Sequence, residues 1–323
     1  MRNIAVLTSG GDAPGMNPCI RSVVRSALTA GVKCYGVRRG YAGLVNGDFE
    51  ELTSRSVGGI LRRGGTFLQT ARSERFKTEP GFHRAVETLK SRGIDGMVVI
   101  GGDGSLRGAR ELHRAAIPVI GVPATIDNDL AVTDTAIGVD TALNTALDAV
   151  DKVKDTASSH HRACVIEVMG RNCGYLALMT GVAGGAEMVV LPEFPCPPQR
   201  IAEEIESAQQ RGKPHFIAIV AEGATPNGQG VLQEVRQAGA AAGFDARLVV
   251  LGHVQRGGSP SAFDRILATR MGAAAFESLQ AGRSGEIVAL VGANLQPVTL
   301  DEVLGKRREL DPDLYQLADV LAQ

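Results

Sequence analysis

Short runs of continuous apolar residues recur along this chain, and segments whose apolar positions follow a helical period separate them. Continuous apolar runs are typical of strands that are buried on both faces of a parallel sheet. They predict strands at residues 4–7, 32–37, 96–100, 117–122, 163–168, 188–191, 216–221, 248–251 and 287–291. The helical period predicts helices at residues 57–61, 80–91, 172–182, 199–210, 229–242 and 262–281, and along the apolar stripes of residues 20–28 and 139–153.

This alternation of strands and helices predicts an α/β fold whose mainly parallel sheets are covered by helices on both faces. The length of 323 residues is typical of about two domains. We expect the second domain to begin with the long amphipathic helix that starts at Val139.

Composition limits the classes of function. Hydrophobic residues make up 44% of the chain and charged residues 21%, as in globular proteins. The 34 basic and 35 acidic residues give a net charge of -1, so no general positive field favours nucleic acid or an anionic membrane. The five cysteines include no Cys-x-x-Cys pair, which argues against a disulfide framework or a zinc site and favours the reducing cytoplasm. We expect neither a signal peptide nor a membrane span.

The stretch Pro123–Asp129 follows a predicted buried strand and places two carboxylates and an amide within three positions. Open α/β sheets bind their ligands at turns of this kind. Asp127 and Asp129 would point the same way in an extended segment, whereas a tight turn would let them converge on one ligand. A simple Asx turn explains the stretch alone equally well, because Asp and Asn hydrogen-bond their own backbone in turns.

Two glycine loops follow other predicted strands and favour a functional interpretation. Residues 9–15 follow the first strand, and residues 101–105, Gly-Gly-Asp-Gly-Ser, follow the strand at 96–100. Glycines let backbone N–H groups turn toward phosphate oxygens, and the helix predicted to start near Ser105 adds its positive N-terminal end. Asp103 would repel phosphate unless a cation lay between them, so it is a candidate Mg²⁺ ligand. The second loop is not a Walker A motif, and the first lacks the dinucleotide fingerprint.

Arginines gather in two further places. Arg21 and Arg25 lie four positions apart on one side of a predicted helix, a spacing more typical of a solvated face. Residues 62–66, Arg-Arg-Gly-Gly-Thr, form a loop with Arg72 that could approach phosphates closely, although arginines in loops usually serve solubility.

Five motifs occur in order along nearly the whole chain. They are residues 9–17 (Ser-Gly-Gly-Asp-Ala-Pro-Gly-Met-Asn), 101–105, 123–129, 169–171 (Met-Gly-Arg) and 251–258 (Leu-Gly-His-Val-Gln-Arg-Gly-Gly). Together they resemble the bacterial 6-phosphofructokinases, whereas a Gly-Gly-Asp-Gly loop alone also occurs in NAD kinases and diacylglycerol-type kinases. The resemblance implies phosphoryl transfer from ATP to the 1-hydroxyl of fructose 6-phosphate, a step of glycolysis.

The resemblance also implies the phosphofructokinase fold, which has two Rossmann-like, three-layer α/β/α domains. The nucleotide-binding domain would comprise residues 1–138 and about 255–305. The sugar-phosphate-binding domain would comprise residues 139–254 and about 306–323.

The catalytic roles follow from the same resemblance. Asp127 would accept the proton of the sugar hydroxyl, and Asp129 would help to orient the site. Arg171 and Thr125 would stabilise the charge on the transferring phosphoryl group, with assistance from the backbone of Gly11 and from Arg72. Such roles suit phosphoryl transfer, which depends on positioning and electrostatic stabilisation.

Binding roles are implied for further residues. Asp103 would hold Mg²⁺, and the nucleotide would be bound by Gly11, Arg72, Ser73, Gly102, Asp103, Gly104 and Ser105. The sugar phosphate would be bound by Thr125, Asp127, Arg162, Met169, Gly170, Arg171, Glu222, Arg247, His253 and Arg256. Of these, Arg162, Arg247, His253 and Arg256 resemble the cluster for the 6-phosphate, a group close to a dianion that suits forked guanidinium donors. Each of these four residues alone would more simply be a surface charge or a satisfied histidine.

In this family, Arg162 and Arg247 reach the sugar phosphate of a neighbouring subunit, which implies a homotetramer with shared active sites. An effector site for ADP, which activates, and phosphoenolpyruvate, which inhibits, is implied at Arg21, Arg25, Arg55, Lys154, Glu187, Arg211, Lys213 and His215. Lys154 stands where an arginine is common and Pro214 where a second lysine is common, so the strength and sign of regulation stay open.

Three alternatives compete with this interpretation. Pyrophosphate-dependent phosphofructokinases share the fold but typically carry Asp at position 104 and Lys at position 124, whereas Gly104 and Ala124 leave room for a nucleotide. Ala124 itself replaces a usual glycine, and Ser73 stands where ATP-using relatives often carry an aromatic residue. Another Gly-Gly-Asp-Gly kinase would not need the arginine cluster. A catalytically dead nucleotide-binding regulator would not need Asp103, Asp127 and Arg171.

Overall fold

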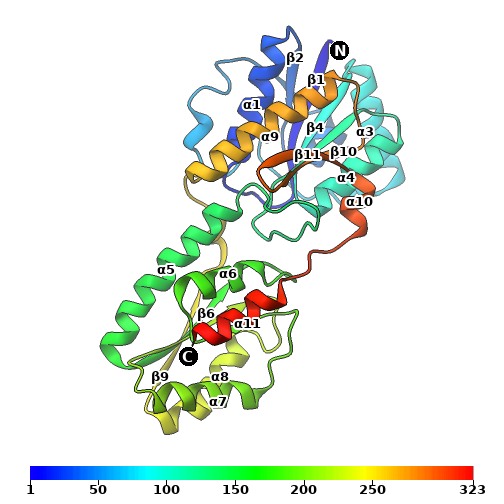
Figure 1. Ribbon diagram of the computed structural model, residues 1–323. Helices are drawn as coiled ribbons and strands as arrows, with labels where there is room; N and C mark the ends of the chain where they lie inside the picture. The colour runs from blue at the N-terminus through cyan, green and yellow to red at the C-terminus, as the bar shows by residue number, and fades with distance from the viewer. Residues whose placement is uncertain (323) are drawn as a thin grey trace. The chain divides into compact units, whose positions relative to one another are not determined.

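The computed structural model describes residues 1–322, and the chain folds as two compact units (Figure 1). The first unit comprises residues 1–126, 130–141 and 256–307. The second comprises residues 127–129, 142–255 and the chain from residue 308 on. The chain therefore passes from one unit to the other several times.

The first unit is built on a seven-stranded sheet in the order β11-β10-β5-β4-β1-β2-β3. Its strands are β1 (Asn3–Ser9), β2 (Lys33–Val37), β3 (Phe49–Leu52), β4 (Gly96–Gly101), β5 (Val119–Pro123), β10 (Glu286–Val291) and β11 (Asn294–Thr299). The five central strands pair in parallel, whereas β3 and β11 pair antiparallel at the two edges. Strands β4 and β5, at the centre of the sheet, have no polar residues because both of their faces are covered.

Helices cover both faces of this sheet. They are α1 (Met16–Thr29), α2 (Gly40–Asn46), α3 (Glu79–Ser91), α4 (Asp103–Arg114), α9 (Ala262–Gln280) and α10 (Leu300–Gly305), with short 3-10 turns η1 (Ile60–Arg62) and η2 (Arg75–Lys77). Ala5, Leu7 and Met97 share one core with α2, α3, α4 and α10. Helices α1 and α9 lie side by side on the other face (Figure 1), where Ser22 Oγ donates to the carbonyl oxygen of Thr269 at 2.6 Å.

The second unit has a four-stranded, wholly parallel sheet in the order β7-β8-β6-β9. The strands are β6 (Arg162–Val168), β7 (Met188–Val190), β8 (Phe216–Ala221) and β9 (Asp245–Val250). They are packed by α5 (Val139–His160), whose first residues belong to the first unit, and by α6 (Tyr175–Gly184), α7 (Pro198–Gln210), α8 (Gly228–Ala242) and α11 (Pro312–Leu321). A 3-10 turn, η3 (Gly252–Arg256), follows β9.

The α/β prediction and its parallel strands are confirmed, but some local predictions are wrong. Residues 57–61 do not form a helix, because Gly59 has a φ of 72° and only the 3-10 turn η1 follows it. The strand expected at 248–251 begins at Asp245, since an edge strand tolerates polar residues. The helix expected near Ser105 begins at Asp103. Elements β3, β11, α2, α10 and α11 were not predicted.

A buried carboxylate organises the start of α5. Asp264, at the first turn of α9, is fully buried and accepts hydrogen bonds from the backbone N–H groups of Gly138 and Thr141, both at 2.8 Å, and from Thr141 Oγ1 at 2.5 Å. Burial raises the pKa of this carboxyl, and the three hydrogen bonds oppose that rise. Asp264 thus satisfies donors that the first turn of α5 leaves without helical partners.

Replacing Asp264 by alanine should lower the free energy of unfolding by about 2–5 kcal/mol, because each buried donor left without an acceptor costs about 1–3 kcal/mol. Urea denaturation followed by circular dichroism measures the loss. Asp148→Ala is the control, because Asp148 lies on α5 with a side chain 66% exposed and pairs with the exposed Lys152. The control should change stability by less than about 0.5 kcal/mol, and equal losses in both variants would contradict the capping role.

Candidate active site

Three neighbouring strands of the first unit end at the same level. Ser9 of β1 pairs with Gly101 of β4, and Gly101 pairs with Pro123 of β5. The loops that follow these strands therefore leave one edge of the sheet together. Strand order also changes direction here, because β2 and β4 lie on opposite sides of β1. Open α/β sheets bind ligands at such a point.

The loop after β1 lies against an arginine. A Cβ atom at Gly11 would come within 2.7 Å of Arg256 Nη1, and Gly10 has a φ of 85°. Arg256 Nη1 donates to the carbonyl oxygen of Asp12 at 3.2 Å, and Thr70 Oγ1 donates to that of Gly10 at 2.8 Å. The lack of a side chain at Gly11 lets the Arg256 guanidinium lie beside the backbone of the loop.

The loop after β4 forms the N-terminus of α4. Gly102 is the N-cap, and the backbone N–H groups of Ser105 and Leu106 both donate to its carbonyl oxygen. A Cβ atom at Gly102 would lie 3.2 Å from Cβ of Thr125, whereas a Cβ atom at Gly104 would meet nothing within 4 Å. The open space at Gly104 and the N-terminus of α4 suit a phosphate group.

Asp103 is the carboxylate in this loop. Its two oxygens accept from Arg107 Nε at 2.9 Å and Nη2 at 3.0 Å, and its side chain is 40% exposed. Within residues 1–322, no group of three or more His, Cys, Asp or Glu side chains is placed to hold a metal ion. A cation here would thus depend on Asp103 together with oxygens of a bound ligand, the arrangement typical of Mg²⁺.

The arginine loop at 62–66 is held by Asn17. Its Nδ2 donates to the carbonyl oxygen of Arg63 at 3.0 Å, and its Oδ1 accepts from the backbone N–H of Phe67 at 2.8 Å. Arg72 is exposed, and Ser73 Oγ accepts from the backbone N–H of Phe76 at 3.2 Å. Ser73 therefore bonds the first turn of η2 through its side chain, whereas the N-cap residue is Glu74.

Residues Asp127–Asp129 belong to the second unit and are bent, because Asn128 has a left-handed φ of 49°. The segment is therefore not extended, and the convergence of Asp127 and Asp129 on one ligand stays a prediction. Asp127 is 2% exposed and Asn128 fully buried. Cys173 Sγ donates to the carbonyl oxygen of Asn128 at 3.9 Å. Because the bend is buried, the Asp127 carboxylate is held in one direction.

Arg171 supplies a positive charge to that carboxylate. Arg171 Nε lies 3.4 Å from Asp127 Oδ2, and the arginine side chain is 56% exposed. The backbone of Arg171 has a φ of 52°, which costs a non-glycine residue about 1 kcal/mol or more. Strained residues of this kind cluster at functional sites, where the surrounding structure holds them in place.

The turn that carries Arg171 is fixed by its neighbours. Glu222 Oε1 accepts from the N–H of Arg171, and Gln255 Oε1 accepts from the N–H of Met169, both at 2.8 Å. Gly170 has a φ of 143°, and a Cβ atom at Gly223 would lie 1.9 Å from the carbonyl oxygen of Arg171. The ends of β6, β8 and β9 thus converge on this turn.

Two of the four residues expected at the sugar phosphate lie together in the second unit. Arg162 and Arg247 both approach the carboxylate of Asp245. His253 is exposed in η3. Arg256 belongs to the first unit, where it contacts the loop after β1.

The residues expected at an effector site also fall into two sets. Lys213 Nζ donates to Glu187 Oε1 at 3.1 Å and to the carbonyl oxygen of Ala322 at 2.7 Å, and Lys154 Nζ donates to that of Gly184 at 2.8 Å. Burial lowers the pKa of His215, buried Glu187 raises it, and the two lysines lower it further. Arg211 is exposed in the same unit, whereas Arg21, Arg25 and Arg55 lie in the first unit.

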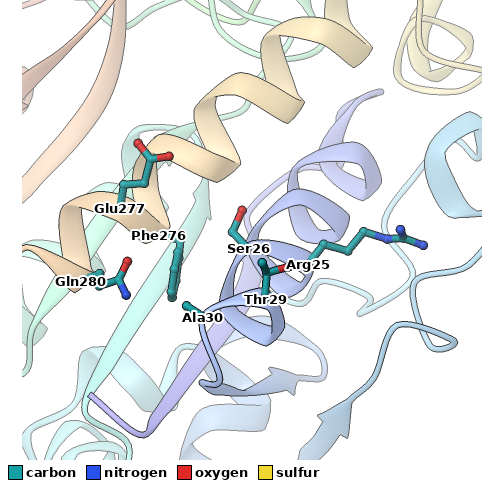
Figure 2. Close-up of a pocket in the computed structure, with 7 residues that line it drawn as sticks. All are labelled: Arg25, Ser26, Thr29, Ala30, Phe276, Glu277 and Gln280. Carbon is teal, nitrogen blue, oxygen red and sulfur yellow. The ribbon is translucent and has the colours of Figure 1, made fainter.

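A shallow pocket lies between α1 and α9. It is lined by Arg25, Ser26, Thr29, Ala30, Phe276, Glu277 and Gln280 (Figure 2). Figure 2 shows that the guanidinium of Arg25 extends away from the residues of α9. Arg25 is the only lining residue that the sequence predicts for any site, so this pocket does not coincide with the strand-end loops.

Sequence reasoning missed several residues that shape these sites. Gln255 is fully buried and lies in the motif at residues 251–258, but the sequence alone suggested no role for it. Gly223 and Asp245 received none either. The only sequence signal for them was their place at the end of β8 and the start of β9, next to residues that were singled out.

Comparison with known proteins finds matches that cover most of the chain or all of it. The Phosphofructokinase family model matches residues 3–279. The chain is 50% identical over 322 residues to the ATP-dependent 6-phosphofructokinase of Natranaerobius thermophilus, and 50% identical over 323 residues to that of Thermotoga neapolitana, with 100% of each chain covered in both cases.

Solved structures share the fold. Saccharomyces cerevisiae phosphofructokinase superposes with a TM-score of 0.87 at 36% identity, over 94% of this chain and 45% of that chain. The pyrophosphate-dependent phosphofructokinase of Marinobacter aquaeolei gives 0.83 at 23% identity, over 98% and 91%. Among residues 1–322, no helix is both long and apolar enough to cross a membrane.

Proposed function

The chain belongs to the phosphofructokinase family, and we propose on this premise that it phosphorylates fructose 6-phosphate at the 1-hydroxyl with Asp127 as the base. Its activity is that of an ATP-dependent 6-phosphofructokinase, a glycolytic kinase. Relatives of 50% identity carry ATP in their names, whereas the pyrophosphate-dependent structure is only 23% identical, so ATP is the donor.

The observation that carries the proposed mechanism is the pairing of buried Asp127 with Arg171. A buried carboxylate held in place beside a guanidinium can accept the proton of an attacking hydroxyl. The half-exposed guanidinium also reaches toward solvent, where it can stabilise the charge spread over the transferring phosphoryl oxygens. Thr125 and Asp129 assist in orientation, as does the backbone of Gly11.

We propose that the first unit is the nucleotide-binding domain and that it binds the phosphoryl donor ATP. The phosphates of ATP are held by the backbone of Gly11, Gly102, Gly104 and Ser105, together with Arg72 and Ser73 from the segment before η2. Bound Mg²⁺ would be held by Asp103 and would neutralise phosphate charge. The support is the open space at Gly104 and the N-terminal end of α4.

We propose that the second unit is the sugar-phosphate-binding domain and that it binds the acceptor, fructose 6-phosphate. Met169, Gly170 and Glu222 contact the sugar, and Arg162, Arg247 and His253 bind its 6-phosphate. We include Arg256 in this cluster because it belongs to the motif at residues 251–258. The support from geometry is that Arg162 and Arg247 flank one carboxylate on neighbouring strands, so both guanidinium groups serve one small region.

The remaining assignments are regulatory and quaternary. We propose a cytoplasmic homotetramer whose subunits share active sites, and an effector site for ADP and phosphoenolpyruvate at the two sets of residues described above. Two ammonium groups in this part of the second unit support an anionic effector, because Lys213 pairs with Glu187 and Lys154 lies at the carbonyl oxygen of Gly184.

Initial rates of fructose 1,6-bisphosphate formation test the proposed function. We expect turnover with Mg-ATP and none above background with Mg-pyrophosphate, because Gly104 leaves space for a nucleotide. Turnover with pyrophosphate alone would overturn the donor assignment and keep the acceptor. No turnover with either donor, together with tight ATP binding by calorimetry, would support a regulatory protein instead.

A further inference from the structure

The carboxylate of Asp245 lies between the two arginines that the proposed function assigns to the sugar phosphate. Asp245 Oδ2 is 2.7 Å from Arg247 Nη2 and 3.5 Å from Arg162 Nε. One oxygen atom thus faces two cations. The Asp245 side chain is 49% exposed, so it stands at the surface beside the arginines.

Strand register brings the three side chains together. Arg162 is the parallel partner of Asp245, and Cys164 is the partner of Arg247. Because side chains alternate along a strand, Asp245 and Arg247 lie on the same face of β9, and Arg162 and Cys164 lie on that face of β6. Burial raises the pKa of Cys164, and in addition the two arginines lower it while Asp245 raises it. All three charges therefore act on the same thiol.

Two guanidinium groups at one place repel each other and have many rotamers. Each arginine side chain loses considerable conformational entropy when a ligand orders it. A carboxylate that lies close to both groups offsets their repulsion and limits their rotamers before the ligand binds. Asp245 forms ion pairs with Nε of Arg162 and Nη2 of Arg247, and Arg162 Nε has no hydrogen-bond partner among residues 1–322, so N–H donors of both forks can face a phosphate.

We propose that Asp245 is a positioning residue for the acceptor, which orders Arg162 and Arg247 for the 6-phosphate of the sugar. This inference rests on the proposed function, because it assumes that the two arginines bind that phosphate. Asp245 touches no substrate in this scheme and acts only through the arginines.

The test is a double-mutant cycle on Asp245 and Arg247, read out as kcat and KM for fructose 6-phosphate. Asp245→Asn keeps the side-chain shape and removes the charge. We expect it to raise KM about three- to tenfold, the effect of losing two partly exposed ion pairs, with kcat changed less than about twofold. In an Arg247→Ala background, the same substitution should change KM less than about twofold. Asp148→Asn, on α5 of the same unit, is the matched control and should match the parent protein.

The outcomes separate this inference from the proposed function. An unchanged KM in Arg247→Ala alone would overturn the assignment of the sugar phosphate. A raised KM in Arg247→Ala with an unchanged or lowered KM in Asp245→Asn would overturn the positioning role and leave the proposed function intact. An equal effect of Asp245→Asn in both backgrounds would mean that Asp245 acts on the fold instead of on the arginines.

Discussion

Replacing Asp127 by asparagine should lower kcat by about 10²- to 10⁴-fold, the usual contribution of a positioned base. Asparagine keeps the size of a side chain that is 2% exposed, so the bend at residues 127–129 has no reason to collapse. The amide cannot take up the hydroxyl proton. The KM for fructose 6-phosphate should stay within about threefold, because the loss falls on the transition state. Steady-state kinetics with saturating Mg-ATP measures both constants.

Asp148→Asn serves as the control for this variant as well, since it makes the same chemical change on an exposed side chain. Thermal unfolding of both variants checks that each is folded. A loss in kcat of only a few fold in folded Asp127→Asn would remove Asp127 from the role of base, whatever its effect on KM.

Replacing Arg171 by alanine should lower kcat about 10²- to 10³-fold, the cost of removing one preorganised donor from a transition-state charge. Arg171 Nε lies 3.4 Å from Asp127 Oδ2, at the position of the proposed base. Lysine at this position should recover part of the loss, because it keeps the charge but not the fork. Steady-state kinetics of the two variants measures the difference.

Arg171→Gly separates the side chain from the backbone. With a φ of 52°, position 171 strains alanine as much as arginine, whereas glycine adopts this conformation freely. Arg171→Gly should therefore be more stable than Arg171→Ala by about 1 kcal/mol and equally inactive. Full activity in either variant would show that the guanidinium plays no part in turnover.

The sequence predicts the parallel core well because the core strands contain continuous apolar runs, as in Gly96–Gly101. Its limits lie at the sheet edges. Strand β3 reads Phe-Glu-Glu-Leu and β11 contains Pro297, and neither pattern meets the requirement for burial on two faces. Edge strands need only one partner, so their sequences carry little signal.

The candidate site shows the same limit in another form. The glycine loops after strands could be predicted from the sequence, because glycine is the residue that tolerates the backbone conformations of such loops. The left-handed backbone of Arg171 could not be predicted, since arginine seldom adopts this conformation. The position of Asp245 between two arginines depends on the register of β6 with β9, which no local pattern encodes. The contact of Arg256 with the loop after β1 joins residues 244 positions apart.

The return of the chain to the first unit at residue 256 has a consequence for synthesis on the ribosome. Strand β10 lies between β5 and β11, and α9 packs beside α1. The late elements α9, β10 and β11 are made after most of the second unit. Until then β5 is an open edge of the nascent sheet, and the face of α1 that meets α9 is uncovered. The second unit can thus complete its sheet first, and the N-terminal half of the protein stays exposed to aggregation for longer than its place in the chain suggests.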